Sequence, residues 1–183
     1  MTRQEALEIL YEHTKGESLR KHALAVEAAM RAYARHYGED EEAWGVVGLL
    51  HDFDYEMYPE FPDHPTKGSE ILKDRGLSEE LRRAILSHVP RMEVPRDTRL
   101  AKHLFACDEL CGFITAAALV RPGKLSGMEP SSVKKKLKDK AFARSVSRED
   151  ITKGAEEAGL DLTEHIRFVI AAMSEAAPEL GLQ

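Results

Sequence analysis

Cysteine is scarce in this sequence, and the two that occur do not form a metal-binding or disulfide motif. Cys107 and Cys111 are four residues apart, which places them one turn apart on the same face of a helix. This is not the CxxC spacing of zinc and redox sites, and it does not indicate a disulfide framework. We therefore expect two small core residues, in a protein suited to a reducing compartment such as the cytoplasm.

Long hydrophobic runs and an excess of positive charge are also missing. No segment approaches the roughly 20 apolar residues of a membrane span, and the N-terminal sequence MTRQEALEIL lacks the apolar stretch of a signal peptide. The formal net charge is -6, so we expect no general attraction to nucleic acid or anionic membranes. An anionic ligand would need a metal or a local basic patch.

Strand-like alternation is absent, whereas helical periodicity runs through most of the chain. The 183 residues fit one domain with one core. We predict a single compact all-α domain of eight to nine helices. Capping residues, glycines and prolines suggest helices at about 2–13, 17–37, 40–51, 65–75, 78–88 and 97–120, a short one from 130, and two more at about 148–158 and 161–177.

Several polar residues lie within or beside apolar helical faces. The pair His51-Asp52 ends the apolar run WGVVGLL, and His22, His88 and Asp108 each share a helical face with apolar residues. A buried carboxylate or imidazole needs a partner, and one shared metal centre would satisfy several of these groups together. The alternative is that Asp52 merely leaves its helix into solvent.

The other histidines are better explained as structural residues. His13, His103 and His165 also border apolar residues, and His36 lies near a helix end. Because apolar neighbours alone do not select a ligand, we expect core-edge or surface positions for these four.

The order and surroundings of the first set resemble the HD-domain superfamily of metal-dependent phosphohydrolases. KHALAVEAAM resembles the first histidine helix, VVGLLHDFD the HD doublet, and HPTKGSEIL the histidine-proline-x-x-glycine segment of HDIG proteins. AILSHV and LFACDEL resemble the last two ligand helices. The likeness covers an HD core at about 18–115. The segments LFACDELCGFITAAALVRP and SSVKKKLKDKAFA also resemble small stand-alone predicted HD hydrolases, which extends it into a C-terminal helical extension at about 120–183.

The resemblance implies a dinuclear metal site. One ion would be held by His22, His51, Asp52 and Asp108, and the second by His64 and His88, with Asp52 bridging the two. Imidazole and carboxylate donors suit manganese, iron, nickel, cobalt or zinc better than magnesium or calcium. The implied reaction is attack of metal-activated water on a small phosphorylated substrate, such as a phosphoester or nucleotide.

Asp54 and Lys67 are further catalytic candidates. Asp54 could orient the attacking water or hydrogen-bond a ligand histidine, or it could be an exposed loop acid. Lys67 lies one turn beyond His64 and could bind the substrate phosphate, or it could be a surface lysine. Several HD groups carry a lysine three residues after the doublet aspartate, where this chain has Tyr55. This difference argues against a cyclic-dinucleotide phosphodiesterase.

Basic residues gather in the C-terminal part of the chain. Arg121 and Lys124 precede a run of lysines at 134–140 that includes Lys135 and Lys136. Helix N-termini and lysines attract phosphate, so these four residues are candidates for a substrate-binding rim over the metal site. The alternative is a solvated helix face, and the run is too short to indicate nucleic-acid binding.

Two other functions share the same ligand order. HD proteins that resemble inositol oxygenase use two irons and O₂ to cleave carbon–carbon or carbon–phosphorus bonds. A non-catalytic HD module would bind a metal or ligand without turnover. Iron dependence with oxygen consumption would favour the first, and tight binding without turnover the second.

Overall fold

All of the regular secondary structure is helical, and no strand is present. The computed structural model describes residues 1–183. Its elements are α1 (Arg3–His13), α2 (Glu17–Tyr37), α3 (Glu41–Leu50), α4 (Asp63–Asp74), α5 (Glu79–Ser87), the 3₁₀ helix η1 (Pro90–Met92), α6 (Arg99–Leu119), α7 (Pro130–Leu137), α8 (Arg148–Glu157), α9 (Leu162–Glu175) and α10 (Ala177–Leu180). The predicted all-α class is confirmed. No helix combines the length and the hydrophobicity that crossing a bilayer requires.

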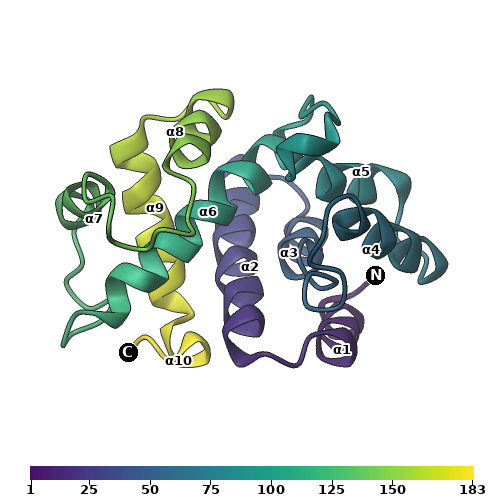
Figure 1. The fold of residues 1–183 in the computed structure, drawn as a ribbon, viewed down its shortest axis with the longest axis horizontal. Coiled ribbons are helices and arrows are strands. Elements are labelled where there is room, and N and C mark those ends of the chain that lie inside the picture. The colour runs from purple at the N-terminus through teal and green to yellow at the C-terminus, as the bar shows by residue number, and fades with distance from the viewer.

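The long helices α2 and α6 lie at the centre of the molecule (Figure 1). The helices α1, α3, α4 and α5 gather on one side of this pair, and α7 to α10 gather on the other. One cluster of 41 buried apolar residues runs through both sides. The two halves of the chain therefore share one core, and α2 and α6 can contribute side chains to a site between them.

Several helices begin and end at residues that are typical helix caps. At the start of α1, Thr2 Oγ1 accepts a hydrogen bond from the backbone N–H of Glu5, whose side chain accepts one from Thr2 in return. Ser78 and Asp161 cap α5 and α9 in the same sense. Helix α2 ends at Gly38, whose φ of 69° is left-handed and favours glycine.

Three details differ from the sequence-based expectation. The long helix α6 is opened by Thr98, whose hydroxyl accepts from the Ala101 N–H, and not by Asp97. The segment Pro90–Met92, expected to be a loop, forms a 3₁₀ turn. The helix expected at 161–177 ends as α9 at Glu175, and a separate turn, α10, follows it, because the ring of Pro178 would clash with the preceding turn of a continuous helix. The chain therefore has ten α-helices, one of them a single turn.

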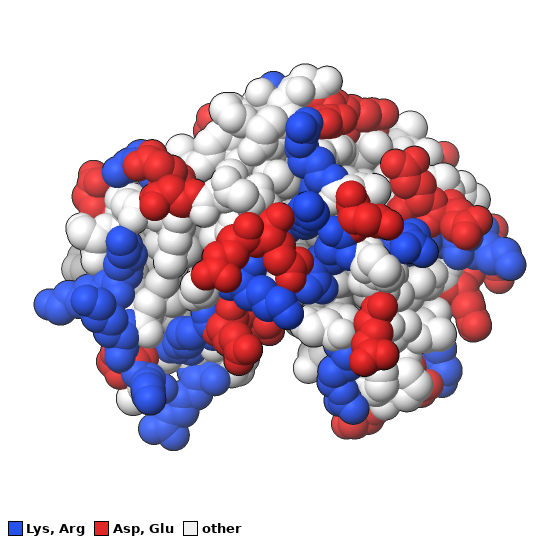
Figure 2. Space-filling model, turned by 90° about the horizontal axis from the view of Figure 1, so that it is seen from above, with Lys and Arg blue, Asp and Glu red and all other residues white.

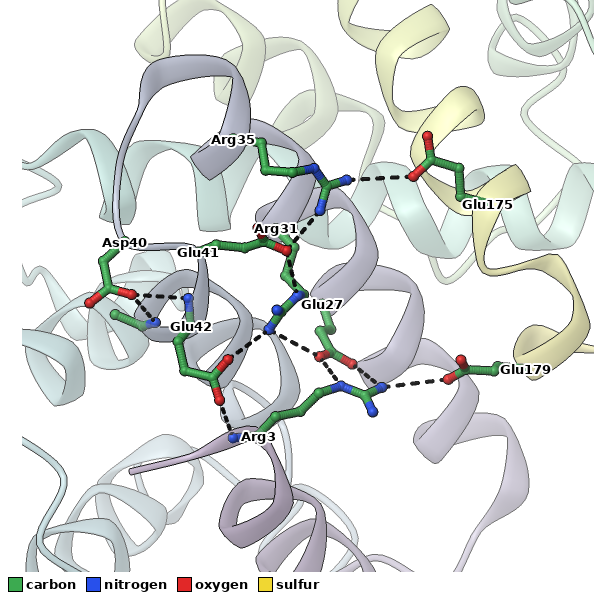
Figure 3. A network of polar contacts seen from close by, with 10 residues as sticks. Arg3, Glu27, Arg31, Arg35, Asp40, Glu41, Glu42, Glu175 and Glu179 are labelled. Carbon is green, nitrogen blue, oxygen red and sulfur yellow. Dashed lines mark hydrogen bonds and ion pairs between the residues drawn. The ribbon is translucent and has the colours of Figure 1, made fainter.

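Ion pairs fix α3 against α2 and α1 (Figure 3). The nearly buried carboxylate of Glu27 on α2 accepts from Arg3 Nε at 2.5 Å and from Arg3 Nη2 at 2.9 Å. Arg31, one turn further along α2, donates to Glu41 at 3.0 Å and to Glu42 at 3.3 Å. A buried carboxylate is stable only when it is paired. These contacts hold α3, whose end carries His51 and Asp52.

Gly48 allows α3 to approach the α2 backbone closely. A Cβ at this position would lie 2.8 Å from the Glu27 Cα and 2.9 Å from its nitrogen. Because backbone atoms cannot move aside without separating the helices, we expect Gly48→Ala to lower the free energy of unfolding by about 1–3 kcal/mol. Urea denaturation followed by circular dichroism measures this change.

Gly45→Ala is the matched control on the same helix. Both variants gain the same helix propensity, about 1 kcal/mol. A Cβ at Gly45 would meet only the flexible side chain of Arg31, whose nearest atom is 2.8 Å away. We expect the Gly45 variant to be clearly more stable than the Gly48 variant, and equal stability would contradict the close-contact explanation.

Candidate metal centre

Separate segments of the chain bring the six predicted ligand residues to one place. His22 lies on α2, His51 and Asp52 follow α3, and Asp108 lies on α6. His64 lies in the first turn of α4 and His88 directly follows α5. Their donor atoms form two groups that share Asp52, and within each group all of them lie within 4.8 Å of one another. The groups are His22, His51, Asp52 and Asp108, and Asp52, His64 and His88.

The first group is tightly gathered around Asp108. Its Oδ1 lies 3.0 Å from His22 Nε2 and 3.4 Å from His51 Nε2. The two Nε2 atoms are 3.3 Å apart, and Asp52 Oδ2 is 3.7 Å from His51 Nε2. Metal–ligand bonds of about 2.0–2.2 Å place neighbouring donors about 3–3.5 Å apart. The spacing of these atoms fits one shared ion.

Asp52 joins the second group to the first. Its Oδ1 lies 3.2 Å from His64 Nε2 and 3.1 Å from His88 Nε2, while its Oδ2 faces His51. The two oxygens of one carboxylate therefore point to different sets of histidines. This is the arrangement that a carboxylate bridging two ions requires.

Backbone carbonyls fix two of the histidine rings. His51 Nδ1 lies 2.8 Å from the Gly48 carbonyl oxygen, and His88 Nδ1 lies 2.5 Å from that of Ile85. Because a carbonyl oxygen only accepts, Nδ1 is the donor in both rings. Nε2 is then the ring nitrogen that faces the centre, as in metal-binding histidines.

Asp54 performs the same role for His64. Its Oδ1 accepts from His64 Nδ1 at 2.8 Å, and its Oδ2 accepts from the Gly68 N–H at 3.0 Å. The residue is 1% exposed. His64 itself has extended backbone angles, φ -82° and ψ 131°, inside α4. Asp54 is therefore a buried partner of a candidate ligand, and not the exposed loop acid that was the alternative.

The cluster strongly favours positive charge. Burial opposes a charge on His51, but the Asp52 and Asp108 carboxylates raise its pKa to about 9. Burial likewise opposes a charge on His64, whose pKa is nevertheless raised to about 9 beside Asp52 and Asp54. Despite its burial, the pKa of Asp52 is held well below its usual range by the surrounding histidines. The same carboxylates would stabilise divalent cations, so the residues fit the metal that the sequence implies.

The centre opens into a cavity of about 410 Å³. Sequence analysis did not identify several residues of its wall, among them Glu109, Ser145 and Asp150. Glu109 accepts from the Ser147 N–H at 3.1 Å, and burial together with Asp108 raises its pKa to about 7. The whole lining is His22, Asp52, Tyr55, His64, His88, Val89, Pro90, Phe105, Asp108, Glu109, Gly112, Ser145, Val146 and Asp150.

The structure does not bring the predicted basic rim into this wall. Lys67 pairs with Asp63 at 2.8 Å, and neither Arg121 nor Lys124 lines the cavity. Arg121 donates to the carbonyls of Ser126 and Gly127, and Lys124 donates to that of Gly181. These side chains bind backbone carbonyls away from the cavity, and the spacing of residues in the sequence does not predict such contacts.

The lysines of α7 lie in a different place. Lys135 lines a second cavity with Lys134, Lys138 and Arg167, and Lys136 lies over the Phe142 ring at 4.4 Å. Figure 2 shows basic side chains gathered at the end of the molecule where α7 lies, at the left of the view. Contact of Lys135 or Lys136 with a substrate in the metal-centre cavity therefore stays a prediction.

The histidines and cysteines expected to be structural mostly lie in the core. His165 and His103 are buried, as are both cysteines, which are free thiols. His36 is exposed, and His13 packs against the Phe53 ring. None of these six side chains belongs to either donor group.

Comparison with known proteins agrees with this geometry. A family model described as HD domain matches residues 19–112, about half of the chain. The chain belongs to the HD domain family. All six candidate ligands lie inside the match, whereas Ser145, Val146 and Asp150 of the cavity wall lie beyond it. No curated protein and no solved structure matches the sequence.

Gly68 keeps Asp54 in place in this HD domain. A Cβ at Gly68 would lie 2.5 Å from both Cγ and Oδ2 of Asp54. Gly68→Ala must displace that carboxylate and release His64 Nδ1. Because loss of such a supporting hydrogen bond typically weakens metal binding 10–100-fold, we expect a loss of about that size for Mn²⁺, measured by calorimetry.

Gly112→Ala is the control for this prediction. Gly112 also borders the cavity, but a Cβ there would come no closer than 3.9 Å to the His22 ring. We expect near-normal Mn²⁺ affinity in this variant. Equal affinity of the Gly68 variant and the wild type would mean that Asp54 does not support the site.

Proposed function

We propose that this protein is a metal-dependent phosphohydrolase that acts on a small phosphoester. The observation that carries the proposal is the position of Asp52, whose two oxygens face different histidines at 3.1–3.7 Å. His22, His51, Asp52 and Asp108 would hold one divalent transition-metal ion, and Asp52, His64 and His88 the other. When bound, such ions lower the pKa of coordinated water and offset the charge of a phosphoryl group.

The chain's own residues would prepare this centre. Hydrogen bonds from Nδ1 of His51 and His88 to backbone carbonyls keep Nε2 directed inward. Asp54 does the same for His64. Since both Asp54 oxygens are already engaged, positioning His64 is a better-supported role for it than orienting water.

Lys67 has weaker support as a phosphate-binding residue. Its ammonium is held by Asp63 at 2.8 Å and lies 4.7 Å from the centre of the Tyr58 ring. It would have to leave these partners to reach a substrate in the cavity. A role for Lys67 is tested by Lys67→Ala, which would raise KM if the ammonium binds phosphate.

Metal reconstitution with a substrate screen tests the proposal. The purified protein is loaded with manganese, iron, cobalt, nickel or zinc, and phosphate release is measured over a broad phosphoester panel. Asp52→Ala is run in parallel, with Asp74→Ala as the control because Asp74 is an exposed acid on α4. We expect turnover by the wild type and the Asp74 variant, and none by the Asp52 variant.

The other outcomes separate the rival functions. Turnover that survives in Asp52→Ala would mean that the reaction takes place elsewhere. Oxygen uptake by the iron form without phosphate release would favour the di-iron oxygenase. Tight binding of a phosphorylated ligand without turnover by any metal form would favour a binding module.

A further inference from the structure

Beyond the candidate metal ligands, the cavity wall has acidic side chains but no basic ones. Glu109, whose pKa of about 7 leaves it charged above neutral pH, and Asp150 are these acids, and no lysine or arginine lines the cavity. Proteins that bind phosphate chains normally surround them with lysine and arginine donors. A substrate with several phosphates would find no such donors here.

Both carboxylates keep oxygens available to a ligand. Glu109 uses one oxygen to accept from the Ser147 N–H at 3.1 Å, and its other oxygen has no partner in the protein. The backbone N–H of Asp150 donates to the Ser147 hydroxyl at 3.1 Å, while the Asp150 side chain makes no hydrogen bond or ion pair. The dipole of α8 stabilises a carboxylate at its start, which explains the presence of Asp150 without a ligand. This explanation does not apply to Glu109, which lies in the middle of α6.

The arginines packed behind the wall are already engaged. Arg96 lies 3.9 Å from the centre of the Phe105 ring and forms two hydrogen bonds with Glu157, at 2.7 and 2.9 Å. Arg148 donates to backbone carbonyls, including that of Val146 at 2.7 Å. Both guanidinium groups are held by these protein partners, and neither arginine lines the cavity.

We propose that this site selects monophosphate esters whose organic part carries hydroxyl or amino groups, and disfavours di- and triphosphates. The proposal rests on the proposed function. The charges of Asp52, Asp108, Glu109 and Asp150 would balance two divalent ions, which leaves the ions to hold one phosphate. Each further phosphate would then lie beside Glu109 and Asp150 without a cation. Hydroxyl or amino donors would instead give both carboxylates hydrogen bonds.

The cavity volume agrees with a compact ligand. About 410 Å³ lies near the lower end of the range found for small-molecule sites. Phe105, Val89 and Val146 supply apolar wall between the polar groups. A sugar or nucleoside monophosphate combines the required features of one phosphate, several donors and some apolar surface.

Calorimetric binding to the manganese-loaded protein tests this inference without requiring turnover. AMP and ATP share one organic part, so the ratio of their Kd values reports the effect of the extra phosphates. At mildly alkaline pH we expect at least tenfold tighter binding of AMP by the wild type. The double variant Glu109→Gln with Asp150→Asn should shift the ratio of Kd values at least tenfold in favour of ATP. Asp150→Asn alone should shift the ratio in the same direction. This single variant removes no side-chain hydrogen bond, because the Asp150 side chain makes none.

Glu149→Gln with Glu156→Gln removes the same charge from exposed positions of α8 and should leave the ratio unchanged. Chelation of Mn²⁺ by ATP in solution affects all variants equally. An unmoved ratio in the Glu109 and Asp150 variants, a wild-type preference for ATP, or no binding of AMP would overturn the inference. Selective AMP binding without phosphate release would count against hydrolysis and leave the inferred selectivity standing.

Discussion

Wild-type protein is expected to melt about 5–15 °C higher in saturating Mn²⁺ than after chelation, whereas Asp52→Ala is expected to show almost no rise. A ligand present at 100–1,000 times its Kd stabilises the fold by about 2.7–4.1 kcal/mol. In a protein of this size, each kcal/mol raises Tm by about 2–4 °C. Because Asp52 belongs to both donor groups, its loss weakens both sites at once. Scanning fluorimetry with and without the metal measures both shifts.

Asp74→Ala serves as the control here too. It removes an exposed carboxylate from α4 but leaves both donor groups intact. We expect a metal-dependent rise equal to that of the wild type. A rise of full size in Asp52→Ala would show that manganese stabilises the fold through some other site, and the ligand assignment would then be wrong.

The six candidate ligands could be named from the sequence because their order and surroundings resemble the HD-domain superfamily, and the structure brings their donor atoms together. Apolar neighbours alone do not separate them from His13, His103 and His165. An aspartate directly after the apolar run WGVVGLL is costly to bury alone, and His51-Asp52 ends that run. Several helix starts could also be predicted from the sequence. Thr2, Ser78 and Asp161 have side chains that satisfy the first N–H groups of a helix, and in the structure they do so.

The far wall of the cavity could not be predicted because tertiary packing builds it. Helix α8 reaches α6 at Gly154, where a Cβ would lie 2.7 Å from the Ala106 Cα. That approach brings Asp150 and the preceding loop to the same cavity as Glu109. No local periodicity in residues 145–150 indicates that they line a cavity with His22 of α2 and with His88, which follows α5.

The position of the basic residues could not be predicted from the sequence either. Lysine composition suggested an anion-binding rim, but composition does not say where a helix packs. Helix α7 packs against α9, and Lys134 donates to Thr163 at 2.8 Å. Asp54 was ambiguous for a related reason. Its partners His64 and Gly68 lie 10 and 14 residues further along the chain, and only the fold of the intervening loop brings them together.

His165 should make the fold sensitive to acid independently of the metal centre. Its Nε2 donates to the Ala106 carbonyl at 2.9 Å, so its Nδ1 accepts from the Tyr33 hydroxyl at 2.6 Å. Burial is the main cause that lowers its pKa from 6.5 to about 4, and His103 adds to the effect. The folded-state pKa lies below the unfolded one, so the stabilisation is complete above pH 6.5 and is lost as the pH falls toward 4. The full loss amounts to about 3 kcal/mol.

The comparison of wild type with His165→Gln isolates this contribution, because other titrating groups cancel in the difference. Unfolding free energies are measured by urea denaturation from pH 7 to pH 4. We expect the advantage of the wild type to shrink by about 3 kcal/mol across that interval. His36→Gln is the control, because His36 is an exposed histidine that contacts Phe168 of the same helix, α9. We expect its stability difference from the wild type to change little with pH. If the advantage over His165→Gln stays constant with pH, then His165 can accept a proton in the folded protein, and the Tyr33 hydroxyl must be able to turn and accept from it.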